Sequence, residues 1–120
     1  MKTRALIMII LLLLAGSVAA ETYTVSITAD GLFDPDYIEI QPGDKIRWEN
    51  NDDGPHRVKA DDGSFDSGRL DPGDSYTRTF NDIGTFGYYD SFHPSITGTI
   101  KVLENAVLPL SWGYLRFLLL

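Results

Sequence analysis

The sequence predicts an all-β protein that folds as a β-sandwich of about seven short strands. Between residues 21 and 105, apolar residues recur with a period of two in short runs, as half-buried strands require. Clusters of Gly, Pro, Asp and Asn separate these runs at regular intervals and favour turns. The same region lacks a long stretch with the 3.6-residue apolar period of an amphipathic helix, which disfavours a helical or α/β fold.

The expected strands follow one another with short connections. Asp30-Gly31 ends the first strand, and Pro42-Gly43-Asp44 turns the second into the third. Residues 64–70 are expected to be irregular. In chain order, we expect strands over Tyr23–Ile27, through Ile38 and Ile40, through Ile46 and Trp48, over His56–Ala60, over Tyr76–Phe80, through Phe86 and Tyr88, and through Ile100 and Val102. The aromatic residues expected in the core are Trp48, Phe80, Phe86 and Tyr88.

Both ends of the chain differ in character from the central domain, residues 21–105. A basic start, an apolar run to Gly16 and the small residues Val18-Ala19-Ala20 predict a signal peptide over residues 1–20, although an uncleaved anchor is an alternative. Cleavage near Ala20 would place the protein outside the cytoplasm, in a periplasmic, cell-surface or secreted location. Residues 106–120 form an apolar tail of unknown role, shorter than the roughly 20 residues of a membrane span. Membrane attachment therefore stays open.

The composition excludes several kinds of chemistry. The chain has no cysteine, so disulfides, thiolate ligands and a cysteine nucleophile are absent. Removing Lys2 and Arg4 from the ten basic residues leaves eight against 17 acidic ones, a net charge of −9. Such a surface repels nucleic acid and suits a basic protein partner or a high-salt medium, although solubility alone also explains it. We expect a monomer.

The segment Gly84–Val102 is expected to form a strand, a short loop and a return strand. The loop carries Asp90 and His93, three residues apart. The only other histidine, His56, lies 34 residues before Asp90, after a turn-rich segment and before a short strand. Histidines in two inter-strand loops of a sandwich have the layout of a metal site at one end of the fold. We therefore expect His56, Asp90 and His93 to lie together.

A longer series of motifs surrounds these residues. Its members are Phe33-Asp34-Pro35, Ile38, Ile40, Pro42-Gly43-Asp44, Ile46, Trp48-Glu49-Asn50-Asn51-Asp52, His56, Val58, Phe65-Asp66-Ser67-Gly68, Leu70, Pro72-Gly73, Phe80, Gly84-Thr85-Phe86, Tyr88, His93-Pro94, Gly98 and Ile100. The series resembles the cupredoxin family of blue copper proteins, and within it the small plastocyanin, amicyanin and halocyanin types. The similarity covers about Tyr23 to Leu103 and implies a Greek-key β-sandwich of seven to eight strands.

The resemblance also implies a ligand set, with two departures from the family. In the family, the last loop reads Tyr, one residue, Cys, two residues, His, two residues, Met, one residue, Gly. Read onto this chain, His56 and His93 take the places of the two histidine ligands, Asp90 that of the cysteine, and Ile96 that of the axial methionine. The residues expected around the ligands are Asn50, Arg57 and Pro94. The Arg57 side chain could pair with Asp90, and thus compete with a metal, or point into solvent.

These departures change the expected chemistry. The blue colour and fast electron exchange of the family depend on a copper–thiolate bond, and a carboxylate instead favours Cu(II). We expect a pale copper site of low potential, with Ile96 closing the axial side to water. Zn(II) and Fe(II) suit the same donors, but copper leads by the Irving–Williams order. Metal binding should weaken in acid, because the histidines must be deprotonated.

By resemblance, the expected role is electron transfer or copper carriage, with a redox or copper-trafficking partner that has a basic surface. The missing thiolate favours carriage or slow redox work over fast electron shuttling. The alternative is a metal-free cupredoxin-fold module with a vestigial site, in which Asp90 caps backbone amides or pairs with Arg57 or Arg69. An enzyme is not expected, since the sequence has no Ser-His-Asp spacing, glycine-rich phosphate loop or paired catalytic carboxylates.

Overall fold

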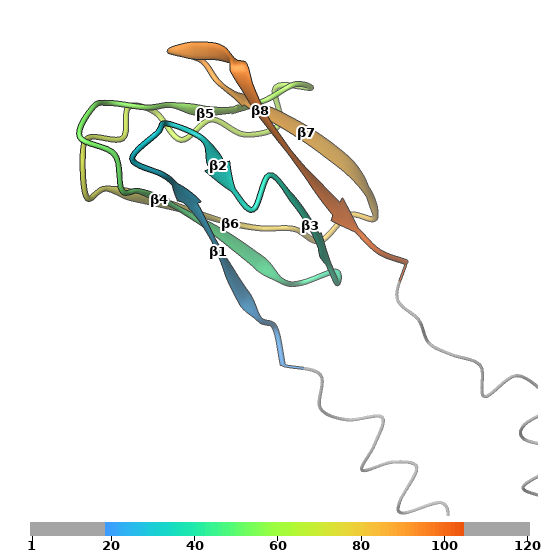
Figure 1. Ribbon diagram of the computed structural model, residues 1–120. Coiled ribbons are helices and arrows are strands. Elements are labelled where there is room, and N and C mark those ends of the chain that lie inside the picture. The colour runs from blue at the N-terminus through green and yellow to red at the C-terminus, as the bar shows by residue number, and fades with distance from the viewer. Residues whose placement is uncertain (1–18, 105–120) are drawn as a thin grey trace, which may run out of the picture.

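The structure, a computed structural model, describes residues 19–104 as a two-layer β-sandwich (Figure 1). One sheet has the strand order β2-β1-β4-β6 and the other β3-β8-β7-β5. The strands are β1 (Thr22–Ile27), β2 (Phe33–Asp34), β3 (Tyr37–Ile40), β4 (Lys45–Asn50), β5 (Val58–Ala60), β6 (Ser75–Thr79), β7 (Gly84–Asp90) and β8 (His93–Val102). The predicted all-β sandwich is confirmed. The apolar tail and nearly all of the predicted signal peptide lie outside the described residues.

Alternating burial explains why these segments form strands. Along β4, Ile46, Trp48 and Asn50 are buried while the residues between them face outward. Along β7, Tyr88 and Asp90 are both buried and share one face. Because every second residue points inward, the last residue of each of these two strands also points inward. That residue is polar in both cases: Asn50 in β4 and Asp90 in β7.

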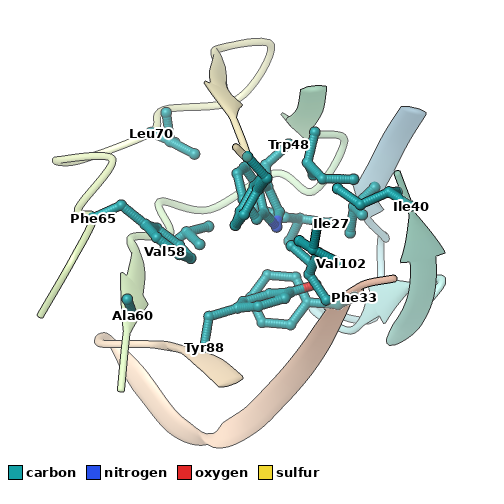
Figure 2. Packing of buried hydrophobic residues seen from close by; sticks show 14 residues of the cluster. Ile27, Phe33, Ile40, Trp48, Val58, Ala60, Phe65, Leu70, Tyr88 and Val102 are labelled. Carbon is teal, nitrogen blue, oxygen red and sulfur yellow. The ribbon is translucent and has the colours of Figure 1, made fainter. Parts of the chain in front are cut away.

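Within residues 19–104, fourteen buried apolar residues from both sheets and from the connections between strands form the core (Figure 2). Trp48 lies at its centre, edge-on to Tyr88 with ring centroids 5.3 Å apart and stacked on Tyr76 at 5.7 Å. Of the predicted core aromatics, Trp48, Phe80 and Tyr88 are buried, and Phe86 is half-buried against Phe80. Gly98 pairs with Tyr88 across the β7–β8 ladder, and a Cβ at Gly98 would lie 2.2 Å from Tyr88 Cζ. A glycine there lets the Tyr88 ring cross into the core.

The structure differs from the sequence prediction at β2, at β5 and at the connection between β7 and β8. The two-residue strand β2 was not predicted, and β5 begins at Val58, so that His56 lies before it in an isolated bridge with Leu70. The predicted loop between the last two strands is shorter than expected, because only Ser91 and Phe92 separate β7 from β8. Asp90 and His93 are therefore strand-terminal residues that pair with each other. The β7–β8 register shifts between Tyr89 and Asp90, so residues 94–96 have no partner in this ladder.

One end of the sandwich gathers several inter-strand connections. β1 and β4 are parallel, with Ile27 opposite Asn50, so the segments that follow them leave at the same end. The β7–β8 turn reaches this end too, and the chain enters β1 and leaves β8 at the opposite end (Figure 1). Across residues 19–104 there is no helix long and apolar enough to cross a membrane.

Candidate metal centre

The structure brings the three predicted ligands together at this end. One potential donor atom from each of His56, Asp90 and His93 lies within 4.8 Å of the other two. His56 and Asp90 are buried, His93 is exposed, and the two imidazole rings have centroids 5.4 Å apart. The group thus has two donors inside the protein and one at its surface.

Asp90 is held by its backbone neighbours. Its Oδ1 accepts hydrogen bonds from the amides of Arg57 (3.1 Å) and Phe92 (3.0 Å). Its Oδ2 contacts Nδ1 of His56. One carboxylate oxygen therefore fixes the side chain, and the other contacts His56. Asp90 therefore caps two backbone amides, as expected for a metal-free module. The same residue also offers a donor atom, Oδ2, next to His56.

His56 is hydrogen-bonded at both ring nitrogens. Besides Nδ1 to Asp90, its Nε2 lies 2.8 Å from Oδ2 of Asp52. Burial by itself lowers the pKa of His56, but the hydrogen bonds to Asp90 and Asp52 outweigh it and leave the pKa above its ordinary value of 6.5. The hydrogen bond from His56 lowers the pKa of Asp52. Both effects stabilise an imidazolium between two carboxylates.

Asp52 is a site residue that the sequence did not identify. It is one of two adjacent aspartates in a turn-rich segment, where carboxylates usually serve the turn itself. The only available signal was a carboxylate four residues before a histidine. A carboxylate that accepts from the second nitrogen of a ligating histidine fixes the tautomer and ring orientation and raises the basicity of the donor nitrogen.

Asn50 holds the segment that carries Asp52 and His56. Its Nδ2 donates to the carbonyls of Gly54 (2.8 Å) and Leu70 (3.0 Å), and its Oδ1 accepts from the amide of Asp52 (3.0 Å). Asn50 is buried, so these bonds are made in the absence of competing water. Asn50 thus lies near the candidate ligands, as expected, and its hydrogen bonds hold the segment that carries Asp52 and His56.

Arg57 does not place its guanidinium on Asp90. The guanidinium makes a two-pronged ion pair with Asp66, at 2.8 Å through Nε and 2.6 Å through Nη2. The hydrogen bond from Arg57 lowers the pKa of Asp66 to about 2. Arg69 pairs with Asp71. The two pairings that could have blocked Asp90, from the side chains of Arg57 and Arg69, are thus not made; Arg57 contacts Asp90 through its backbone amide. Pro94 is exposed directly after His93.

A surface pocket of about 400 Å³ adjoins the group. Its lining includes His56, His93 and Ile96, together with Asp30, Asp52 and Asp53. Ile96 is half-buried and packs against the core. Because Ile96 is one wall of a pocket that also reaches both histidines, it does not seal them from solvent.

The donor set fits a transition metal in kind and nearly in spacing. Nitrogen and oxygen donors bound at about 2.0–2.2 Å to one metal lie roughly 3.0–3.5 Å from each other. The three candidate donor atoms here lie within 4.8 Å of one another, which is close to that spacing. Two imidazoles and a carboxylate suit copper, zinc and iron.

A family model described as the cupredoxin-like domain matches residues 3–102. The chain belongs to the cupredoxin-like family. Cupredoxins are typically copper proteins of electron transfer. This cupredoxin is 32% identical to a plastocyanin from Scenedesmus fuscus over 95 residues, 66% of this chain and 97% of that protein. It is also 32% identical to a chloroplastic plastocyanin from Tetradesmus obliquus, over 72% of this chain and 70% of that protein.

Solved structures share the fold. A purple cupredoxin from Nitrosopumilus maritimus matches with a TM-score of 0.61 and 28% identity, over 71% of this chain and 100% of that one. A methionine-to-alanine mutant of amicyanin in its Cu(I) form matches with a TM-score of 0.64 and 26% identity, over 74% and 89%. A copper-containing nitrite reductase from Thermus scotoductus matches with a TM-score of 0.64 and 29% identity, over 74% of this chain but 24% of that one.

Proposed function

We propose that this cupredoxin binds one copper ion through His56, Asp90 and His93, with Asp90 at the position that a thiolate holds elsewhere in the family. The convergence of three donor atoms within 4.8 Å, two of them in buried residues, carries this proposal. Copper leads zinc and iron by the Irving–Williams order.

The residues around the ligands would set the properties of the site. Bound copper would supply a one-electron couple. Asp52 would orient the His56 ring, and the two amides on Asp90 Oδ1 would leave only Oδ2 for the metal. Without a thiolate or thioether the site should be pale and of low potential, because a carboxylate favours Cu(II). Copper carriage or slow electron transfer follows from this more readily than fast shuttling.

The proposal also covers the location of the protein and its partner. We infer export after cleavage near Ala20, and a redox or copper-trafficking partner with a basic surface that complements the acidic domain. Nucleic acid is not an expected partner. We do not propose an enzyme; the similarity to nitrite reductase spans only 24% of that protein.

A second candidate is a metal-free module. One observation favours it: both nitrogens of His56 have carboxylate partners, so a proton on each can hold the site closed without a metal. Such a module would recognise a partner through its surface and leave copper unbound.

A copper titration decides between the two candidates. Protein produced from the full sequence is titrated with Cu(II) against a competing chelator, alongside Asp90→Ala, His93→Ala and the control Asp82→Ala, which removes an exposed carboxylate in the β6–β7 connection. We expect one site in the wild type and in Asp82→Ala, and its loss in the other two. Equal copper binding by all four proteins would refute the ligand set.

A further inference from the structure

The pocket beside the candidate metal centre is kept open next to His56. Gly31 lines it with φ of +76°, a conformation that side chains other than glycine rarely adopt. A Cβ at Gly31 would lie 3.6 Å from Cε1 of His56 and 3.8 Å from Oδ2 of Asp52. A longer side chain at this position would therefore occupy the space against the ring.

The protein offers the metal three donor residues, His56, Asp90 and His93. Ile96, on β8, lines the same pocket as His56 and His93 and has no donor atom. A metal with three protein ligands keeps a further position for a molecule from solvent when that position is accessible. His93 is exposed, and the pocket of about 400 Å³ is large enough for a small molecule.

We propose that a metal held by His56, Asp90 and His93 keeps one coordination position open to this pocket, and that this position takes a small neutral nitrogen base in preference to an anion. The inference rests on the proposed function, because it requires the metal to bind. It goes beyond that function in assigning a binding site for an external ligand and the chemical class of that ligand.

The charges around the pocket select the ligand class. Asp30, Asp52 and Asp53 all line it, and Asp90 brings a further carboxylate to the metal. A concave surface lined by one sign of charge lowers the local concentration of ions of the same sign. An anion such as azide is therefore disfavoured, while neutral imidazole or a neutral amine is not.

The test uses the full-length protein loaded with one equivalent of Cu(II) at pH 8, where imidazole is mostly neutral because its pKa is about 6.5–7. Imidazole and azide are titrated separately, and electron paramagnetic resonance follows the copper. Gel filtration in the presence of imidazole checks that copper stays on the protein. We expect a saturable change with additional nitrogen hyperfine structure from imidazole, and azide affinity weaker by about tenfold or more.

Two variants and a control locate the ligand. Ile96→Met places a thioether at the pocket wall and should lower imidazole affinity, whereas Ile83→Met, at an exposed isoleucine between β6 and β7, should not. Asp30→Asn combined with Asp53→Asn should raise azide affinity more than imidazole affinity.

The outcomes separate this inference from the proposed function. Failure to bind copper overturns both. A copper complex whose spectrum does not respond to imidazole, or which loses its copper to imidazole, overturns the open position alone. Azide binding as tight as imidazole overturns the assigned ligand class.

Discussion

At the scale of single residues, His56 is the centre of the site. It lies in the interior with Asp52 on one nitrogen and Asp90 on the other. A proton and a metal compete for Nδ1, because a metal ligand must be deprotonated. The same contacts therefore predict opposite pH dependences for the stability of the metal-free protein and for its metal affinity.

The metal-free protein should become less stable as the pH rises above neutrality. The pKa of His56 is higher in the folded protein than the 6.5 expected when unfolded. Its contribution is thus fully present below pH 6.5 and is lost as the pH rises through the folded pKa. Urea unfolding at pH 6 and pH 9 should show higher stability at pH 6, with a smaller difference in His56→Gln. A wild type that is equally stable at both values would contradict the paired imidazolium.

Copper affinity should depend on Asp52 although Asp52 is not a ligand. Asp52→Ala removes the acceptor on Nε2 of His56, and loss of such a partner typically weakens metal binding by about 10–100-fold. Asp53→Ala removes the neighbouring carboxylate and should change affinity far less. Competition titrations at one pH give both values, and equal losses in the two variants would mean that only charge matters.

At the scale of elements, the segment between β4 and β5 determines where His56 lies. Asn50, the last residue of β4, holds it through three hydrogen bonds made by a buried amide. Asn51, next in the chain, is exposed, and its side chain bonds only to Ser26 Oγ among the described residues. The two asparagines form a matched pair for testing this role.

Asn50→Ala should lower the free energy of unfolding by about 2–3 kcal/mol, because it removes three hydrogen bonds made by a buried amide side chain. It should also weaken copper binding, since Asp52 and His56 lose their support. Asn51→Ala should cost less than about 1 kcal/mol and leave copper affinity unchanged. Chemical denaturation and copper titration of both variants give the comparison. Two variants of equal stability would show that the Asn50 bonds do not hold this segment.

Most strands could be predicted because alternation is a local signal. Val25 and Ile27 on β1 and Ile46 and Trp48 on β4 mark their buried faces directly in the sequence. Strand β2 could not be predicted, because two residues are too few to show an alternation of apolar and polar side chains. The parallel pairing of β1 with β4 depends on contacts between distant segments, which no local pattern encodes.

The candidate ligands were accessible from motif order, but their surroundings were not. The two histidine-bearing loops predicted that His56, Asp90 and His93 lie together, and the resemblance to cupredoxins implied their places in the ligand set. The partners of His56 Nε2 and of the Arg57 guanidinium depend on side-chain directions in irregular segments. Several acidic residues lie near each of them in the sequence, so only the fold could single out Asp52 and Asp66.

At the scale of the whole molecule, the fold separates packing from chemistry. The aromatic core around Trp48 fills the sandwich (Figure 2). Polar residues at strand ends and in connections line a pocket at one end. Two of the candidate ligands, Asp90 and His93, lie at strand ends, and His56 lies in the connection before β5.

The optical spectrum of copper-loaded Asp90→Cys tests the central claim most directly. If Asp90 occupies the thiolate position, this one substitution gives copper a thiolate ligand in addition to His56 and His93. The variant should then show an intense visible absorption band, while the copper-loaded wild type stays pale. Ser91→Cys is the control, since it places a thiol one residue away. Stoichiometric copper in Asp90→Cys without such a band, or equal colour in the control, would contradict the proposed position of Asp90 at the metal.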